Sequence, residues 1–265
     1  MLTNYHTHTT FCDGKSTVEE VVLTALEKGF DAIGFSGHGY TAFDYSYCMR
    51  DTDGYLAEIR RVKEKYGKEI EIYAGVEEDS SYPLDHSQFD YVLGSSHYFR
   101  VGGVYYPVDS SYECMQVAVS VYQGDAIRMA EDYYGAFCTY INIYRPDIIG
   151  HFDLLTKFDE QHPFFLPNDK YRALAVKYAL EAAKSGAIFE VNTGAISRGY
   201  RTTPYPHAEI LHALKKEGAK VILCADSHHK DTIDFGFEDA KALLREIGFT
   251  SVMHLHRGEF KSEAI

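Results

Sequence analysis

Short apolar runs alternate along the chain with longer runs in which apolar residues recur at helical spacing. The short runs are rich in β-branched and aromatic residues, a composition typical of buried strands. We expect strands at residues 2–6, 31–36, 69–76, 90–95, 147–150, 187–192 and 220–225, and a further short extended run at residues 251–256.

The segments between these runs carry helix start and stop signals. Residues 16–19 have the pattern of a capping box, and Gly29 is a suitable stop for the helix that follows. Asp51 and Asn168 are of the residue types that cap helix N-termini. We expect helices at residues 16–28, 51–66, 110–144, 168–184, 206–217 and 234–247, and a hairpin at residues 98–107.

Strands that alternate with helices favour an α/β fold with a parallel sheet. Seven strand-helix units in a chain of 265 residues favour a closed, TIM-barrel-like (β/α) barrel over an open sheet. No linker, repeat or composition shift divides the sequence. We therefore predict a single domain over residues 1–265.

Histidines and carboxylates follow the predicted strands, at the point where each strand ends. Six of the thirteen histidines are at such positions, whereas random placement would scatter them over helices and both barrel ends. The C-terminal ends of barrel strands converge, so we expect these side chains to meet. The candidate metal ligands are His6, His8, Asp13, His38, Glu77, His97, His151, Asp226 and His228.

These residue types favour a metal centre. Imidazole and carboxylate together suit zinc, iron or manganese. His6 and His8 are two residues apart on an extended segment, so both side chains leave the same face. Glu77 has two oxygens and can bridge two ions, although Glu78 and Asp79 compete for that role. Nine donors exceed the needs of one ion, and a cluster of two or three divalent ions is implied.

Less specific interpretations exist for the same residues. A single histidine such as His38, His97 or His151 is more often a packing residue bonded to a carbonyl, and Asp13 could cap the turn before Gly14. The metal site is favoured only because histidines or carboxylates follow the ends of several predicted strands at once.

The net charge limits the classes of molecule that this protein is expected to bind. The formal charge is −13, and no basic run of five or more residues occurs, so nucleic acid should be repelled. Three divalent ions would outweigh Asp13, Glu77 and Asp226 and leave a net positive pocket. A small phosphorylated substrate fits such a pocket.

The cysteines and the apolar runs indicate the cellular compartment that we expect for this protein. The cysteine count is five, and none are spaced as C-x-x-C, which favours a reducing, cytoplasmic setting over a disulfide framework. We expect no secretory signal and no membrane span. The oligomeric state is left open.

The motifs HTHTTFCDG, SGHG, GVE, SSH, GHFD and ADSH, between residues 2 and 228, resemble those of the PHP (polymerase and histidinol phosphatase) family. The opening motif with Asp13 is most similar to the histidinol-phosphatase branch. The resemblance implies a distorted seven-stranded α/β barrel and a trinuclear metal site. It implies one ion on His6, His8, Glu77 and Asp226, a second on Glu77, His97 and His151, and a third on Asp13, His38 and His228.

The resemblance also implies an activity. In the phosphatase branch a basic residue after the sixth strand binds phosphate, and Arg198 and Arg201 are the candidates here. We expect a metal-dependent phosphatase that converts L-histidinol phosphate to L-histidinol and phosphate in histidine biosynthesis. Asp226 or His228 would supply a proton to the leaving group.

Three alternatives remain at this stage. A related phosphoesterase would act on another small phosphorylated metabolite or a nucleotide. An amidohydrolase-like barrel also begins with H-x-H, but no lysine follows a central strand in the required position. A structural metal module would be closed by four tight ligands rich in cysteine, unlike this histidine-rich set.

Overall fold

A curved, mostly parallel sheet forms the centre of the computed structural model, which describes residues 1–265. The strand order is β1-β2-β3-β4-β7-β8-β9-β10-β11, and every neighbouring pair is parallel except β10 with β11. The strands are β1 (Thr3–Asn4), β2 (Ala32–Phe35), β3 (Glu71–Asp79), β4 (Tyr91–Ser95), β7 (Ile148–Ile149), β8 (Ile188–Asn192), β9 (Val221–Cys224), β10 (Ser251–His256) and β11 (Glu259–Ala264). The predicted α/β class is confirmed.

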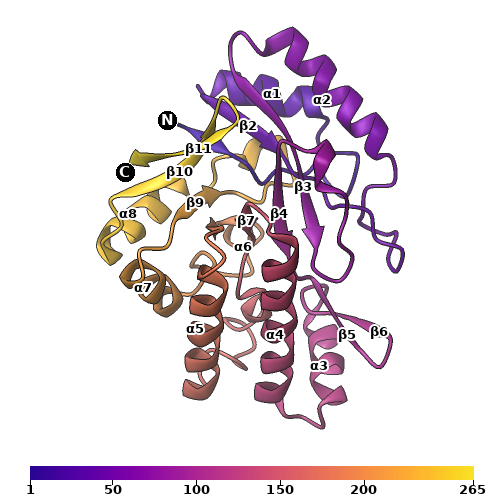
Figure 1. Ribbon diagram of the computed structural model, residues 1–265, viewed down its shortest axis with the longest axis vertical. Coiled ribbons are helices and arrows are strands. Elements are labelled where there is room, and N and C mark those ends of the chain that lie inside the picture. The colour runs from indigo at the N-terminus through magenta and orange to yellow at the C-terminus, as the bar shows by residue number, and fades with distance from the viewer.

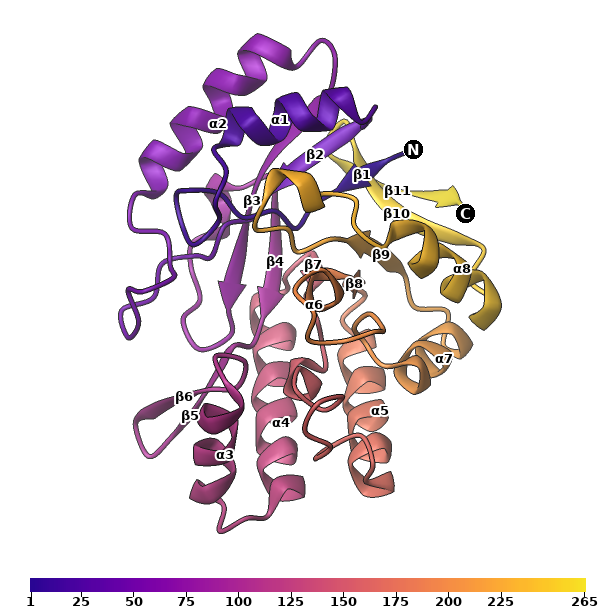
Figure 2. The ribbon, with the colours of Figure 1, turned by 180° about the vertical axis from the view of Figure 1, so that it is seen from behind.

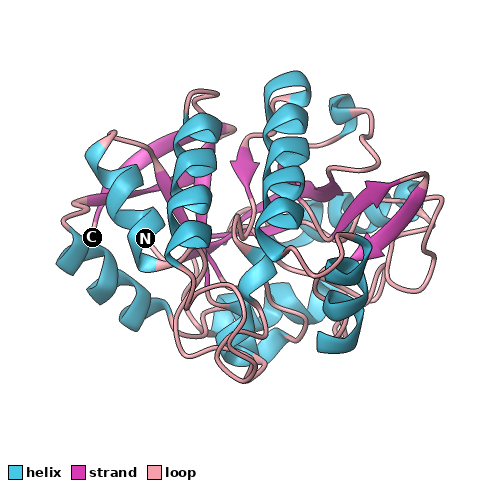
Figure 3. Cartoon of the chain, turned by 90° about the horizontal axis from the view of Figure 1, so that it is seen from below, coloured by secondary structure: helices cyan, strands magenta, loops and turns pink.

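Helices lie around the outside of this sheet (Figures 1 and 3). In Figures 1 and 2, α1 and α2 lie at one end of the molecule, α3, α4 and α5 at the opposite end, and α7 and α8 along one side between them. The helices are α1 (Val18–Glu27), α2 (Thr52–Tyr66), α3 (Tyr112–Val121), α4 (Ala126–Tyr144), α5 (Asp169–Ala183), α6 (Gly194–Ser197), α7 (Ala208–Lys216) and α8 (Phe237–Ile247). None of them combines the length and hydropathy needed to cross a bilayer.

The sheet differs from the predicted closed seven-stranded barrel. All seven predicted strands form and are neighbours, but β9 pairs onward with β10 instead of with β1. Ladder pairing between the segments that follow β1 and β9 is limited to an isolated parallel bridge between Thr7 and Ser227. The hydroxyl of Tyr5 donates to the backbone oxygen of Leu255 (2.9 Å) and accepts from its N–H (3.0 Å). A side chain thus occupies the seam where strand pairing would close a barrel.

Two helix predictions need correction. The expected helix over residues 110–144 is two helices, α3 and α4, because Gln123 and Gly124 between them have positive φ angles of 57° and 85°. The capping box of α1 is formed by Thr17 and Glu20, one residue later than expected. The hairpin is present as β5 (Tyr98–Val101) and β6 (Val104–Pro107).

The inner face of the sheet is filled by tyrosine and aliphatic side chains. Alternation along β3 sends Ile72 toward α1 and α2 and Tyr73 into this interior. Tyr91 crosses the interior, and its hydroxyl donates to the backbone oxygen of Tyr5 (2.6 Å). Its ring lies directly over Gly75, where an added Cβ would be 2.3 Å from Cζ of Tyr91. The interior is therefore closely packed around one large aromatic ring.

We expect Gly75→Ala to lower the free energy of unfolding by about 1–3 kcal/mol, since overpacking of a filled core displaces neighbouring groups. Urea denaturation would measure the change. Gly135→Ala in α4 is the matched control, because its added Cβ has no neighbour closer than 3.6 Å. This control should be neutral or stabilising by up to about 1 kcal/mol, as alanine is the better helix former. Equal stability of Gly75→Ala and wild type would contradict this account of the interior.

Candidate metal centre

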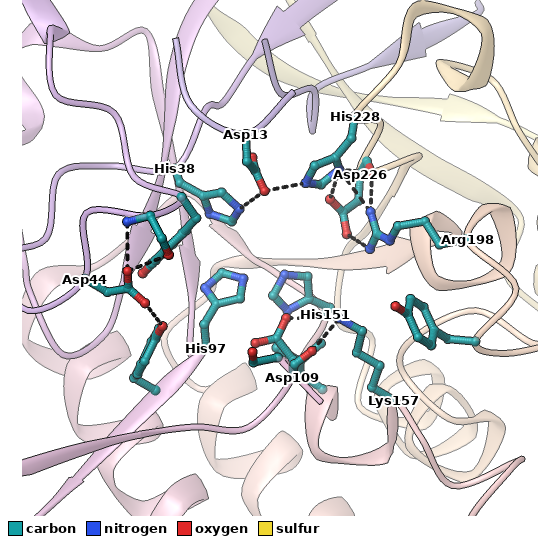
Figure 4. A pocket seen from close by; sticks show the side chains of 16 residues that line it. Asp13, His38, Asp44, His97, Asp109, His151, Lys157, Arg198, Asp226 and His228 are labelled. Carbon is teal, nitrogen blue, oxygen red and sulfur yellow. Dashed lines mark hydrogen bonds and ion pairs between the residues drawn. The ribbon is translucent and has the colours of Figure 1, made fainter. Parts of the chain in front are cut away.

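The nine residues expected to bind metal meet at the carboxyl ends of the parallel strands. They line or underlie one pocket with a volume of about 320 Å³ (Figure 4). Their donor atoms fall into overlapping groups within which all donors lie within 4.8 Å of one another. The groups are His6, His8 and Asp226; His6, Glu77 and His151; His38, Glu77 and His97; and His8, Asp13, His38 and His228.

The deepest donors surround one point below the pocket floor. Nε2 of His6 lies 3.3 Å from Oε2 of Glu77 and 3.6 Å from Oδ1 of Asp226. The corresponding distances from Nε2 of His8 are 3.5 Å and 3.3 Å. The two imidazole nitrogens and Glu77 Oε2 are buried yet form no hydrogen bond. Buried polar atoms normally have partners, so four donors facing one point fit a divalent ion.

The other oxygen of Glu77 belongs to a second group. Oε1 lies 2.9 Å from Nε2 of His151 and 3.3 Å from Nε2 of His97. His97 is held from behind, because its backbone N–H donates to Oδ2 of Asp79 (2.9 Å). Glu77 therefore faces two groups at once, as a bridging carboxylate does.

A third group lies nearer the solvent. Oδ2 of Asp13 is 3.3 Å from Nε2 of His228 and 3.7 Å from Nε2 of His38. Nδ1 of His38 lies 2.9 Å from Oε2 of Glu77, so this ring lies between Glu77 and Asp13. These three donors match the third ligand set that the family resemblance implies.

Only one of three consecutive acidic residues at the end of β3 faces the centre. Glu78 points the other way and is fully buried, with Oε1 accepting from the hydroxyl of Tyr140 (2.5 Å). Asp79 binds backbone N–H groups, including that of His97. The structure thus selects Glu77 from the three candidates.

Carboxylates and imidazoles in the cluster shift one another's pKa values. Burial alone would raise the pKa of Glu77, but His6 and His97 hold it well below its usual value. Burial, together with His228 and His38, lowers the pKa of His8 to about 3. A carboxylate and a neutral imidazole are the forms that bind metal ions. Burial would lower the pKa of His6 and His97, but Glu190 beside His6 and Glu77 beside both rings raise it well above its usual value, so metal binding displaces protons there.

The backbone is strained where it presents Asp226. This residue has a φ of +46°, in the left-handed region that non-glycine residues seldom adopt. Its side chain lies against Gly194, where an added Cβ would be 2.7 Å from Cβ of Asp226. Strain of this kind is commonly stored at functional sites.

The two arginines predicted to bind substrate are in different environments. Arg198 lines the pocket, and its guanidinium donates to Oδ2 (2.9 Å) and the backbone oxygen (3.0 Å) of Asp226. Arg201 is 3% exposed and is not among the pocket-lining residues. Its guanidinium bonds to Thr156 and packs over the ring of Tyr205 at 4.3 Å. Of the two, only Arg198 can meet a ligand in this pocket.

A second cation lines the pocket. Nζ of Lys157 donates to the backbone oxygen of Asp109 (2.6 Å) and lies 3.3 Å from Oδ2 of the same residue. Asp109 also lines the pocket and did not stand out in the sequence, because it follows the hairpin and not a strand of the sheet.

Glu190 in β8 is the clearest residue that the sequence reasoning missed. Its carboxylate lies 2.6 Å from Nδ1 of His6 and accepts from the backbone N–H of His151 (2.7 Å) and from Nδ2 of Asn192 (3.0 Å). It is a charged residue with apolar neighbours in β8 and shares a strand face with Asn192 at the strand end. That pattern was the available signal.

We expect Glu190→Gln to weaken metal binding about 10- to 100-fold, because carboxylates behind ligating histidines orient the ring and raise its basicity. Competition between the purified protein and a fluorescent zinc chelator would measure this without turnover. Glu238→Gln on the surface of α8, where Glu238 pairs with Lys241 at 3.0 Å, is the control. Wild-type zinc affinity in Glu190→Gln would show that this carboxylate does not support the site.

Several known proteins are similar to this chain in sequence or share its fold. The chain is 27% identical to a probable histidinol-phosphatase of Schizosaccharomyces pombe, with 96% of this chain and 89% of that protein covered. It is 23% identical to the histidinol-phosphatase of Bacillus subtilis, with 88% and 96% covered. The structure is similar to that of histidinol phosphate phosphatase from Lactococcus lactis in complex with zinc, L-histidinol and phosphate. The TM-score of that comparison is 0.75 at 20% identity, with 98% of both chains covered.

The putative histidinol phosphatase of Listeria monocytogenes has the same fold, with a TM-score of 0.74 at 22% identity, and 89% of this chain and 99% of that chain are covered. The sequence model of the PHP domain matches residues 4–194, which include seven of the nine predicted ligands. The chain belongs to the PHP domain family.

Proposed function

We propose that this protein hydrolyses a small phosphate monoester, L-histidinol phosphate, to L-histidinol and phosphate. The observation that carries the proposal is the convergence of nine imidazole and carboxylate donors next to Arg198 in one pocket. The names of the curated relatives and the ligands of the Lactococcus lactis complex support the choice of substrate.

We propose two or three divalent ions, zinc, iron or manganese, as the cofactors. The first is held by His6, His8, Glu77 and Asp226, the second by Glu77, His97 and His151, and the third by Asp13, His38 and His228. When bound, such ions lower the pKa of a coordinated water and offset the charge on phosphoryl oxygens. Histidine and carboxylate ligands do not distinguish strongly among these metals.

Arg198 binds the phosphoryl group in this proposal. Its planar guanidinium suits two oxygens of a phosphate, and its bonds to Asp226 already hold it at the pocket wall. Lys157 supplies a second positive charge. Asp226 and His228 border the pocket beside Arg198, and one of them would pass the proton released by the attacking water to the leaving alkoxide.

We also propose that residues 1–265 form a single domain. One continuous sheet through residues 3–264 supports a single domain, arranged as a distorted barrel that is open between β1 and β10. The five cysteines are all free, which supports a reducing, cytoplasmic location. The net charge of −13 supports a small substrate rather than nucleic acid.

Removal of the metals should abolish hydrolysis of L-histidinol phosphate, since no other group in the pocket can activate water as strongly. Phosphate release would be measured before dialysis against chelator, after it, and after addition of zinc, manganese or iron(II), with metal content determined by mass spectrometry. Full activity in metal-free protein would refute the proposed function. A much higher kcat/KM for a nucleoside bisphosphate would instead change the substrate.

Arg198→Lys should raise the inhibition constant for inorganic phosphate roughly 10-fold or more, because a charge-assisted bidentate contact is lost while the positive charge stays. Arg201→Lys is the matched comparison, and it should affect thermal stability more than phosphate inhibition. The reverse ranking of the two variants would assign phosphate binding to Arg201.

A further inference from the structure

The pocket has a carboxylate that no metal group uses, on the side away from Arg198. Figure 4 shows Asp44 and Arg198 on opposite sides of the histidines that line the pocket. Asp44 belongs to the loop between β2 and α2 and lies within 4.0 Å of no lysine, arginine or histidine nitrogen. It is an anion at the rim with no cation of its own.

Asp44 is held in place by three hydrogen bonds. Oδ1 accepts from the backbone N–H (2.8 Å) and the hydroxyl (2.6 Å) of Ser46, and Oδ2 accepts from the hydroxyl of Tyr98 (2.5 Å). These bonds outweigh the effect of burial and lower the pKa of Asp44, so the group is ionised at neutral pH. The other carboxylate of the wall, Asp109, differs because Lys157 already offsets its charge.

Aromatic rings adjoin this carboxylate. Tyr47 and Tyr98 both line the pocket and are stacked at 6.0 Å with an interplanar angle of 20°. Phe43 packs against Tyr98 at 4.9 Å and braces it from the loop. Aromatic faces attract cations, so these rings suit the wall of a cation site beside Asp44.

We propose that Asp44, with Tyr47 and Tyr98, binds a cationic nitrogen group of the substrate, and that the pocket thereby selects phosphate monoesters that carry an ammonium or imidazolium group. This inference rests on the proposed phosphatase function. Arg198 at one side and Asp44 at the other match a molecule that is anionic at its phosphate and cationic at its far end. Neither the metal ligands nor Arg198 can provide that discrimination, because both recognise only the phosphate.

A purely structural role for Asp44 makes a different prediction. In that case the side chain would only tie the loop to β5 through Tyr98 and Ser46. Asp44→Asn removes the charge, keeps one oxygen that can accept from Ser46, and leaves an amide N–H that can donate to the hydroxyl of Tyr98. The variant therefore separates the two roles.

The test compares L-histidinol phosphate with p-nitrophenyl phosphate, which has no cationic group, on the metal-loaded enzyme. Asp44→Asn should reduce the ratio of kcat/KM for the first ester over the second by roughly 10- to 100-fold, as expected when one charge-assisted contact is lost. Most of the loss should be in KM for L-histidinol phosphate. The dissociation constant of L-histidinol, measured by calorimetry, should rise by a similar factor.

Asp132→Asn is the matched control, because Asp132 accepts from the hydroxyl of Tyr122 (2.9 Å) outside the pocket. It should keep the wild-type ratio and dissociation constant, and thermal unfolding would verify that both variants are folded. A ratio and an L-histidinol affinity within twofold of wild type in Asp44→Asn would overturn the cation subsite and leave the phosphatase proposal standing. Failure of the wild type to hydrolyse either ester would refute the phosphatase proposal, and calorimetry with L-histidinol would still decide the subsite.

Discussion

A carboxylate buried among imidazoles is the constraint on which the rest of this structure depends. Glu77 is 1% exposed, and an isolated charge at that depth would be strongly destabilising. Its oxygens instead face nitrogens of His6, His38, His97 and His151, which come from loops after four different strands. Those loops meet only because the strands are parallel neighbours with their carboxyl ends at one edge. The order of the strands in the sheet thus places the four histidines around the carboxylate of Glu77.

A second set of carboxylates surrounds the donors and limits how they move. Glu190 lies behind His6 and the backbone of His151, and Asp79 holds the backbone of His97. These contacts come from strands, which hold reactive groups more rigidly than loops do. The outer wall of the pocket, with Asp44, Tyr47 and Tyr98, comes instead from a loop and the hairpin. The strands hold the candidate metal ligands, and a loop and a hairpin can change in sequence without disturbing those ligands.

Much of the candidate site was predictable from the sequence because strand ends are easy to recognise and the donors follow them directly. His6 with His8, and Asp226 with His228, needed only the period of a strand and a count of loops. Glu190 was missed because it lies within β8, before the strand end, and only its charge among apolar neighbours marks it in the sequence. The choice between Arg198 and Arg201 depended on the path of residues 194–205, which local pattern does not specify. The open seam between β1 and β10 arises from one tyrosine side chain and a late strand pair, and neither is a property of local sequence.

The bridge between Thr7 and Ser227 joins the two ends of the sequence at the metal site. These residues are near opposite ends of the sequence, yet backbone bonds from His8 to Ser227 (2.8 Å) and from Ser227 to His6 (3.0 Å) align the first histidine pair with the loop that holds Asp226. Contacts between such distant segments require closure of a very long loop. A chain that lacks the segment after β9 has no Asp226, one of the four innermost donors that face one point. We therefore expect tight metal binding to require the polypeptide from the first histidine pair through that last loop.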